Sequence, residues 1–375
     1  MRQRWWNGVV CLIAAGLLAG VAVRMDGRRI AAADFVVPTV LPVPAVARSD
    51  AYPQPMVTGA AHAPAAVVLA DGRIAAFWFQ GSREAASDVR LKSSVFADGA
   101  WGPIRDVTDG VRTGADEGRI IKTVGNPIVF RHPDGEFWLV YVSVTVGGWS
   151  GSSLNLMRSP DGIAWGPARR LVTSPFLDVS TLDRSPPLLR SDGLVALPVY
   201  HEMITSYPLL LFLDRNGAVV DRARMGGRCQ IQPWLVPLGG GKALALMREH
   251  SCASRRLWQT VTTDGGLSWG PVTDTGFADP DAPAAAVRLS DGRIAAVVND
   301  DARSAAVLRL AFSADDGATW QRGPAVFDGG TTELDYRYPW MLQDQTGRLH
   351  VLISESKRAI RDAVLGAGDL VAAKP

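Results

Sequence analysis

A short phrase recurs along this chain, and its repetition constrains the fold more than any other feature. The phrase reads Ser/Thr-x-Asp-x-Gly-x-Ser/Thr-Trp and is followed closely by Gly-Pro. It is complete at residues 313–320 and 262–269, one residue short at 159–165, and reduced to Trp101-Gly102-Pro103 in a fourth copy. Self-similarity of this kind is the signature of a repeat architecture.

The residues of the phrase predict a tight turn with an apolar plug. The Asp side chain can accept hydrogen bonds from nearby backbone N–H groups, and Gly can adopt the positive φ that the corner requires. The Trp then folds back beside the turn. We interpret each copy as a structural brace, so the aspartates of the phrase are poor catalytic candidates.

A second repeat predicts how many such units the chain contains. Six segments share the order proline, apolar strand, turn, apolar strand, and they begin at Pro64, Pro127, Pro187, Pro233, Pro283 and Pro339. The steps between them are 63, 60, 46, 50 and 56 residues. Two inner strands and two outer strands per unit are typical of a propeller blade. We therefore predict an all-β fold, a six-bladed β-propeller.

Composition and length fit one propeller domain. We place it at residues 61–370 and expect residues 34–60 to be a linker that also gives one strand to close the ring. The formal net charge of +2 does not favour binding to nucleic acid or electrostatic binding to a membrane. We expect a monomer.

The N-terminus has the pattern of a signal peptide or membrane anchor. Arg2 and Arg4 precede an uncharged stretch at residues 5–23, which ends at Arg24. Such a stretch is about long enough to cross a bilayer. We assign residues 1–33 to this segment and favour an uncleaved anchor in the inner membrane, with the propeller periplasmic or at the cell surface. Cleavage near residues 31–33 stays an alternative.

Two of the three cysteines flank one predicted inner hairpin. The turn of the fourth unit centres on Gly240, eleven residues after Cys229 and twelve before Cys252. These positions face each other in an antiparallel hairpin, which makes a disulfide geometrically reasonable. An oxidising compartment would permit it, and two unrelated thiols are the alternative.

Six blades with these Asp-box turns resemble the sialidase family, in particular bacterial sialidase-like proteins with BNR repeats. The resemblance covers roughly residues 50–365. It implies three arginines for the sugar carboxylate, a Tyr nucleophile, a Glu that activates the Tyr, and an acid/base carboxyl on a first-blade loop. A neutral Tyr suits a substrate whose anomeric carbon carries a carboxylate, and a guanidinium suits that carboxylate.

The resemblance assigns several residues to these roles. Tyr338, in Tyr338-Pro339-Trp340, opens the sixth blade where the family has its nucleophile, and Tyr336 is a nearby competitor. Arg248 and Arg303 follow the inner hairpins of blades 4 and 5, as carboxylate-binding arginines do in the family.

The first-blade loop supplies two acids. Glu84 is in the family's acid/base position and Asp88 in that of a second acid, just before the third strand. Glu in place of the family's Asp lengthens the acid/base side chain by one methylene.

Two positions depart from the family pattern. His62 is found where the first carboxylate-binding arginine is expected, and Gln230 lies where blade 4 should begin with the activating Glu. Glutamine cannot act as a base, so we expect Glu333 or Asp335 to replace it. Further basic candidates for the substrate, at or near the strand starts, are His62, Arg184, Arg228 and Lys122.

These residues support three readings of function. The first is a retaining exo-glycoside hydrolase that removes a terminal acidic sugar from a glycan without cofactor or metal. The second is a lyase that eliminates across a uronic acid, since His, Tyr and Arg can share one mouth. The third is a propeller that binds glycan without turnover, which the departures at His62 and Gln230 would suit.

Overall fold

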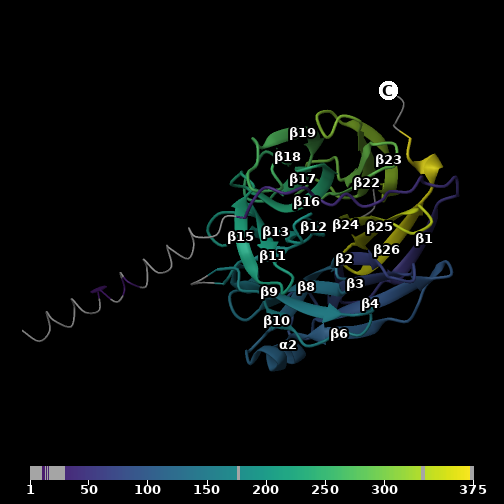
Figure 1. Cartoon of the computed structure of the whole chain (residues 1–375). Coiled ribbons are helices and arrows are strands. Elements are labelled where there is room, and N and C mark those ends of the chain that lie inside the picture. The colour runs from purple at the N-terminus through teal and green to yellow at the C-terminus, as the bar shows by residue number, and fades with distance from the viewer. Residues whose placement is uncertain are drawn as a thin grey trace, which may run out of the picture.

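The computed structural model describes residues 11, 12, 14, 16, 30–174, 178–330 and 334–371, and its strands form six antiparallel sheets. The sheets are arranged as blades around a central axis (Figure 1). The prediction of a six-bladed β-propeller is confirmed. In every blade the first strand lies nearest the axis, and the following strands lie progressively outward.

The blades follow one another along the chain. Blade 1 contains β2 (Ala60–Val68), β3 (Ile74–Gly81), β4 (Arg90–Ala97), β5 (Ala100–Trp101) and β6 (Arg105–Asp109), and blade 2 contains β7 (Thr123–Arg131), β8 (Phe137–Val144), β9 (Ser152–Ser159) and β10 (Arg169–Arg170). Blade 3 contains β11 (Leu182–Asp183), β12 (Leu188–Leu189), β13 (Val195–His201), β14 (Tyr207–Leu213) and β15 (Val219–Arg224), and blade 4 contains β16 (Gln230–Gly239), β17 (Lys242–Glu249), β18 (Arg256–Thr262) and β19 (Thr273–Ala278). Blade 5 contains β20 (Ala285–Arg288), β21 (Ile294–Val298), β22 (Val307–Ser313) and β23 (Gln321–Asp328), and blade 6 contains β24 (Tyr336–Gln343), β25 (Leu349–Glu355), β26 (Ala359–Leu365) and β1 (Ser49–Gln54).

The outer strand of blade 6 comes from the other end of the chain. β1 pairs antiparallel with β26, with Ser49 opposite Val364. The last blade is therefore built from both chain ends, and opening the ring would break this ladder of backbone hydrogen bonds.

The repeated turns brace one blade against the next. In the blade 2 copy, Asp161 Oδ1 accepts hydrogen bonds from the backbone N–H groups of Ile163 and Ala164, at 2.8 and 2.9 Å. Trp165 then packs edge-on against Phe77 of blade 1, with ring centroids 5.6 Å apart. The structural interpretation of the phrase is confirmed, and its acids lie away from the axis.

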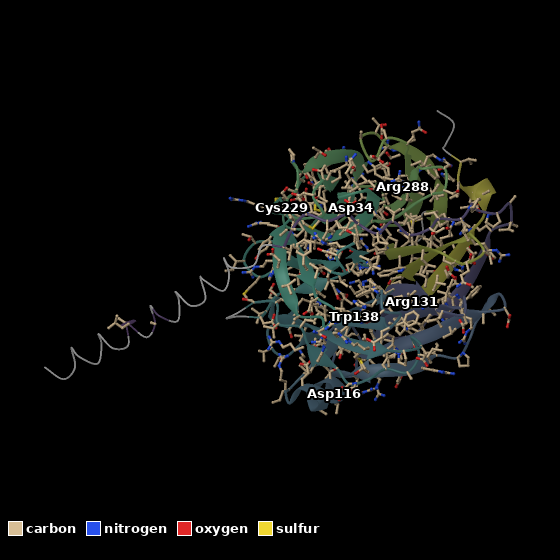
Figure 2. All side chains as sticks on the ribbon, in the orientation of Figure 1. Asp34, Asp116, Arg131, Trp138, Cys229 and Arg288 are labelled. Carbon is tan, nitrogen blue, oxygen red and sulfur yellow. A yellow bond between two sulfur atoms is a disulfide. The ribbon has the colours of Figure 1, made fainter. Side chains whose placement is uncertain are left out.

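Helical structure is minor in the propeller as described. One α-helix, α2 (Gly110–Glu117), joins blades 1 and 2, and Asp109 caps its N-terminus by accepting from the N–H of Arg112 at 2.8 Å. Two 3-10 turns, η1 (Gly148–Gly151) and η2 (Ala367–Asp369), complete the set. Figure 2 labels Asp116 on α2 at the edge of the molecule, and Trp138, which is fully buried, in β8 of blade 2.

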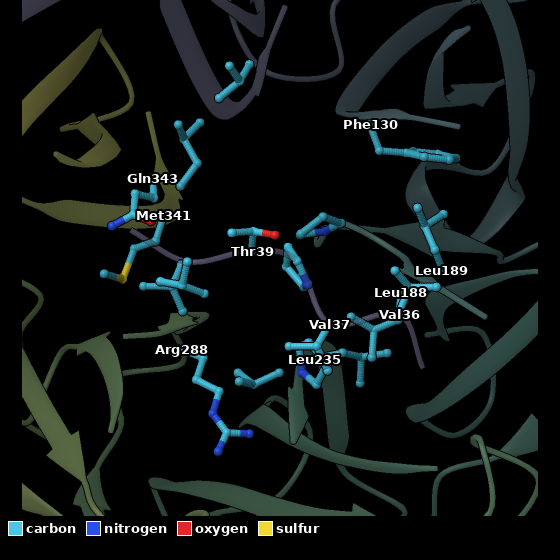
Figure 3. A pocket seen from close by; sticks show the side chains of 18 of the residues that line it. Val36, Val37, Thr39, Phe130, Leu188, Leu189, Leu235, Arg288, Met341 and Gln343 are labelled. Atoms are coloured by element: carbon cyan, nitrogen blue, oxygen red, sulfur yellow. The ribbon is translucent and has the colours of Figure 1, made fainter. Parts of the chain in front are cut away.

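The chain before β1 crosses one face of the propeller. The N–H of Phe35 donates to Gly240 O of blade 4, and the N–H of Leu41 donates to Gln343 Oε1 of blade 6, both at 2.8 Å. This segment lies at the turn face, where the first and second strands of each blade are joined. Behind it lies a cavity of about 800 Å³ with mainly apolar side chains such as Val37, Leu235 and Met341 (Figure 3).

The expected leader falls almost entirely outside the described residues. No helix within the described part of the chain is long and apolar enough to span a bilayer. The predicted anchor and export of the propeller remain predictions.

Candidate active site

The polar cavity of the propeller lies at the face opposite the turns, where the first strands begin. We call this the mouth face. The cavity has a volume of about 450 Å³ and receives side chains from all six blades. Its lining residues are Glu84, Asn126, Trp149, Leu182, Tyr200, Glu202, Arg248, His250, Asp281, Asp335, Arg337, Tyr338 and Lys357. The cavity at the turn face is mainly apolar, whereas the lining at the mouth face is rich in titratable side chains.

A repeated backbone distortion aims side chains at this cavity. In blades 1, 2, 4 and 6 the residue before the opening proline has a positive φ, of 56°, 42°, 52° and 55° at Ala63, Asn126, Gln232 and Tyr338. The pairing of the first two strands shifts at each of these points. Such bulges turn a side chain out of the alternation of the strand. Positive φ is uncommon for these residue types and is found where strain serves function.

Tyr338 presents its hydroxyl oxygen to two donors. Gln232 Nε2 lies 3.1 Å from Tyr338 Oη, and Arg248 Nη1 lies 3.5 Å from it. Gln232 also donates to Tyr200 Oη at 3.1 Å and accepts from Arg248 Nη1 at 3.0 Å. Donors on a phenol oxygen stabilise the negative charge that develops there when the proton leaves.

Arg248 is the centre of a charged cluster between blades 4 and 5. Its Nε lies 2.8 Å from Asp281 Oδ1, and His250 Nδ1 lies 3.2 Å from Asp281 Oδ2. Burial alone would lower the pKa of Arg248, but Tyr338 and Asp281 outweigh this and raise it. The hydrogen bond to Asp281 raises the pKa of His250. Arg248 is therefore a permanent cation beside the Tyr338 hydroxyl.

The second arginine of the cavity is Arg337, not Arg303. Arg337 Nε lies 2.7 Å from Asp335 Oδ2, and its Nη1 donates to backbone carbonyls of Pro280 and Asp281, both at 3.2 Å. Arg303 is exposed, and it does not line the cavity. The expectation that Arg303 holds the substrate is not met: it lies in the loop between β21 and β22, where its backbone N–H donates to Asp301 Oδ1 at 2.7 Å, outside the cavity lining.

The two acids of the first-blade loop are separated by the fold. Glu84 lines the cavity and forms an ion pair with Lys357 of blade 6, with Nζ 2.8 Å from Oε2. Asp88 is exposed and does not line the cavity; its carboxylate accepts from the N–H and hydroxyl of Ser82, at 3.0 and 2.9 Å. These bonds lower the pKa of Asp88 and give it a loop-closing role.

A further acid comes from blade 3. Glu202 follows β13 and lines the cavity near Tyr200. Burial raises the pKa of Glu202, against the opposing charges of His250 and Arg248. A carboxyl with a raised pKa in a cleft is a candidate for proton transfer. On the same wall, Trp149 and Leu182 provide an apolar surface.

His62 is buried beneath the cavity and does not line it. Its Nδ1 lies 2.7 Å from Ser354 Oγ, and its ring packs against Tyr338 with centroids 4.2 Å apart. Burial, together with the charges of Lys357 and Arg184, holds the pKa of His62 well below its usual value. A neutral buried imidazole does not bind a substrate carboxylate, so this expectation is not met.

The other predicted basic residues lie away from the cavity. Arg184 is fully buried below Tyr338, while Arg228 and Lys122 are exposed and absent from the lining. Gln230 accepts from the backbone N–H groups of Arg228 and Cys229, at 3.2 and 3.3 Å. The glutamine beside Tyr338 is therefore Gln232, two residues after the Gln230 that the sequence analysis assigned to this position.

The remaining predictions concern Glu333, Asp335, the cysteines and metal binding. Glu333 lies outside the described residues, and Asp335 is ion-paired with Arg337. A disulfide joins Cys229 to Cys252, with Cα atoms 5.6 Å apart. Within the described residues, no three His, Cys, Asp or Glu side chains form a group that could hold a metal ion.

Sequence comparison now places the chain in a family. A family described as a BNR repeat-like domain matches residues 72–351. The chain belongs to this family. Comparison with curated protein sequences gives no match.

Solved structures with a similar fold include sugar-processing enzymes. The Hadza microbial sialidase Hz136 superposes with a TM-score of 0.70 at 16% identity, covering 83% of this chain and 66% of its own. The Penicillium chrysogenum alpha-L-arabinanase complexed with arabinobiose has a TM-score of 0.65 at 14% identity, covering 89% and 100%. A Dyadobacter fermentans protein of unknown function has a TM-score of 0.68 at 17% identity, covering 88% and 100%. At these identities the similarity shows that this BNR repeat-like chain has a glycoside hydrolase-like fold.

Several residues of the site escaped the sequence analysis, among them Gln232, which contacts Tyr338, and the lining residues Arg337, His250 and Lys357. A signal for the first was present, because every repeat was recognised by its opening proline. The residue before that proline is the one that the bulge turns toward the axis, as Asn126 and Tyr338 also show. No comparable pattern marks Lys357, which lies in the turn between β25 and β26.

Proposed function

We propose that this BNR repeat-like propeller is a retaining exo-glycoside hydrolase that removes a terminal sugar bearing a carboxylate, with Tyr338 as nucleophile. The observation that carries the proposal is the setting of Tyr338 Oη, 3.1 Å from Gln232 Nε2 and 3.5 Å from Arg248 Nη1, at the wall of a sugar-sized polar cavity. A neutral phenol approaches an anomeric carbon that carries a carboxylate without charge repulsion.

The first chemical step would form a bond between Tyr338 Oη and the anomeric carbon while the bond to the leaving oxygen breaks. Glu84 would act in its protonated form: it would give its proton to the leaving oxygen, and the ion pair with Lys357 seen in the structure would then stabilise the carboxylate that results. The phenol proton would pass to Glu202, because burial raises the pKa of this carboxyl group and favours its taking up a proton. In the second step Glu84 would take a proton from a water that attacks the anomeric carbon, the bond to Tyr338 Oη would break, and Glu202 would return its proton to the departing phenolate; the result is net retention.

The substrate carboxylate would meet cations on the blade 6 side of the cavity. Arg337 uses Nε and Nη1 for its protein contacts, and no hydrogen bond from its Nη2 to another described residue is found. That nitrogen is therefore available to a carboxylate, and Lys357, although paired with Glu84, adds positive charge beside it. Arg248 adds positive charge from blade 4.

The decisive experiment compares Tyr338→Phe with Tyr336→Phe on a fluorogenic acidic glycoside. Tyr336 is a matched control, because it is buried and stacks on Phe327 outside the cavity. Tyr338→Phe should lower kcat by a thousandfold or more, and Tyr336→Phe by less than threefold. A slow fluorinated acidic sugar should leave a covalent adduct on the Tyr338 peptide. Equal kcat in the two variants would overturn the proposal.

The proton donor can be identified from how the activity of each variant depends on the leaving group of the substrate. Glu84→Gln should lose activity with alkyl glycosides and retain much of it with activated aryl glycosides, which need no protonation. Glu202→Gln should lose both equally. The reverse pattern would transfer the acid/base role to Glu202.

A second candidate function is hydrolysis of a neutral sugar. The cavity has four carboxylates, Glu84, Glu202, Asp281 and Asp335, against the three cations Arg248, Arg337 and Lys357. Both arginines are already ion-paired. Two carboxylates would then perform the chemistry without a tyrosine. Turnover of an arabinoside by wild type and by Tyr338→Phe, without turnover of acidic glycosides, would favour this function.

A further inference from the structure

The start of blade 3 contacts the first strands of four other blades below the cavity. Asn126 of blade 2 donates to Asp183 O at 3.3 Å. Arg184 donates to carbonyl oxygens of blades 1 and 6, and Ser185 Oγ donates to Pro233 O of blade 4. Residues 183–185 thus form a hub at the axis, and every contact falls at or beside one of the positive-φ bulges.

Arg184 is the central residue of this hub. Its Nη1 donates to Pro64 O at 3.0 Å, and its Nη2 donates to Tyr338 O at 2.6 Å and to Pro339 O at 2.9 Å. The guanidinium carbon lies 5.0 Å from the centre of the Tyr338 ring. Burial lowers the pKa of Arg184 to about 10, so the guanidinium stays charged at neutral pH.

The three carbonyl oxygens lie at two bulges, Pro64 O in blade 1 and Tyr338 O and Pro339 O in blade 6. The regular strand pairing is interrupted at both bulges, and Arg184 supplies the donor there. The ladder between β24 and β25 breaks between Arg337 and Trp340, where Tyr338 has its φ of 55°. Buried carbonyls without a partner are costly. Without Arg184, β24 can avoid the unpaired carbonyls by losing the bulge and pairing regularly with β25. Such a change of register changes the direction of a side chain, and Tyr338 Oη would then move away from Gln232 and Arg248.

We propose that Arg184 is the positioning residue for Tyr338: it holds the left-handed turn that aims the phenol into the cavity, without touching the substrate itself. The catalytic part of this inference rests on the proposed function. The conformational part does not, because it concerns only where the Tyr338 side chain lies.

The test uses Arg184→Gln and Arg184→Lys, with Arg190→Gln as matched control. Arg190 is also a buried arginine of blade 3 that donates to backbone carbonyls, with Gly265 O at 2.6 Å and Ala31 O at 2.7 Å, but at the turn face. All variants are compared in the folded state, verified by circular dichroism at each assay temperature. Arg184→Lys retains the cation and keeps the test valid where Arg184→Gln fails to fold.

Two readouts separate positioning from general stability. Arg184→Gln should lower kcat about a hundredfold with KM changed less than threefold, because a small misplacement of a nucleophile acts on the chemical step. Arg184→Lys should recover part of this loss, and Arg190→Gln should leave kcat within threefold. Equal kcat losses in the Arg184 and Arg190 variants would overturn the proposal.

The second readout does not depend on activity. In protein labelled with 3-fluorotyrosine, the ¹⁹F resonance of Tyr338, assigned by its loss in Tyr338→Phe, should shift in both Arg184 variants and stay in place in Arg190→Gln. An unshifted resonance in the Arg184 variants would refute the positioning role. A shifted resonance in a protein that turns over no glycoside would refute only the proposed function.

Discussion

The amide nitrogen of Gln232 lies 3.1 Å from the phenol oxygen of Tyr338, in the position where a base would act on that tyrosine. An amide donates and cannot accept the phenol proton. It stabilises the oxygen by hydrogen bonding and leaves proton removal to another group. Replacing this one amide by a carboxylate would turn the contact into a pair of an acid and a base.

Converting that amide to a carboxylate should increase turnover. In Gln232→Glu, the new carboxylate would accept from Tyr338 and stay ionised beside Arg248. A positioned base contributes about a hundredfold or more, so we expect kcat on an acidic glycoside to rise at least tenfold. Gln230→Glu is the control, since that side chain accepts from the backbone N–H groups of its neighbours Arg228 and Cys229 and does not line the cavity. Unchanged or lower kcat in Gln232→Glu would argue against Tyr338 as nucleophile.

Arg337 and Arg303 should differ in their effect on substrate binding. Arg337→Met should raise KM for an acidic glycoside by about tenfold to a hundredfold, the loss expected for one charge-assisted contact of about 1.5–3 kcal/mol. Arg303→Met removes the same charge from an exposed position and should change KM less than twofold. Steady-state kinetics at several salt concentrations tests this pair. Equal changes of KM in both variants would mean that the overall positive charge of the protein, and not a direct contact with Arg337, affects substrate binding.

A buried histidine of blade 6 should make stability depend on pH. His350 Nδ1 lies 2.9 Å from Asp362 Oδ2; burial opposes the charge, but Asp362 and Asp344 raise the pKa of His350 to about 9. A raised folded-state pKa stabilises the protein fully below pH 6.5, and this contribution is lost as the pH rises through 9. The loss should be on the order of 3 kcal/mol.

Urea unfolding of wild type and His350→Gln between pH 6 and pH 10 measures this contribution. The difference between the two proteins should shrink as the pH rises, since other titrating groups are common to both. A constant difference across this range would show that His350 is neutral in the folded protein.

The turn phrase should control stability and not catalysis. A Cβ built on Gly162, at φ 75°, would lie 2.6 Å from Leu69 Cδ2 of blade 1, whereas one on Gly193, at φ 84°, meets nothing within 4 Å. Gly193→Ala should cost about 1–2 kcal/mol for its backbone conformation alone. Gly162→Ala should cost about 1–3 kcal/mol more, because the overlap with Leu69 adds to the strain.

Denaturant titrations of both glycine variants measure these costs, and kcat/KM should stay within twofold of wild type. A loss of activity in folded Gly162→Ala would mean that the conformation of the blade 2 turn affects the cavity at the mouth face.

The six-bladed architecture could be predicted because it follows from local sequence features that repeat along the chain. The phrase that ends at Trp165 needs only neighbouring residues to form its turn, and its hydrogen bonds join Asp161 to Ile163 and Ala164. Strand alternation and opening prolines are equally local. Their repetition determines the number of blades, and a propeller is the way such units bury their apolar faces.

The site could be predicted only in part. Tyr338, Arg248 and Glu84 were identified and do line one cavity, whereas Arg303 and Asp88 were identified and do not. Each of the five lies near a strand end, and the sequence does not reveal which way such a loop turns.

The sequence by itself determined six repeated blades, braced by turns and built from strands that begin at a proline. Only the tertiary structure decided which polar residues meet at the axis. Gln232 reaches Tyr338 across 106 positions of sequence, and Arg184 reaches the carbonyl oxygen of Tyr338 across 154. These contacts form because ring closure brings the first strands of the blades together, and because each bulge redirects one side chain out of the alternation of its strand. Local sequence preferences predict neither the ring closure nor the bulges, because both arise from packing between blades.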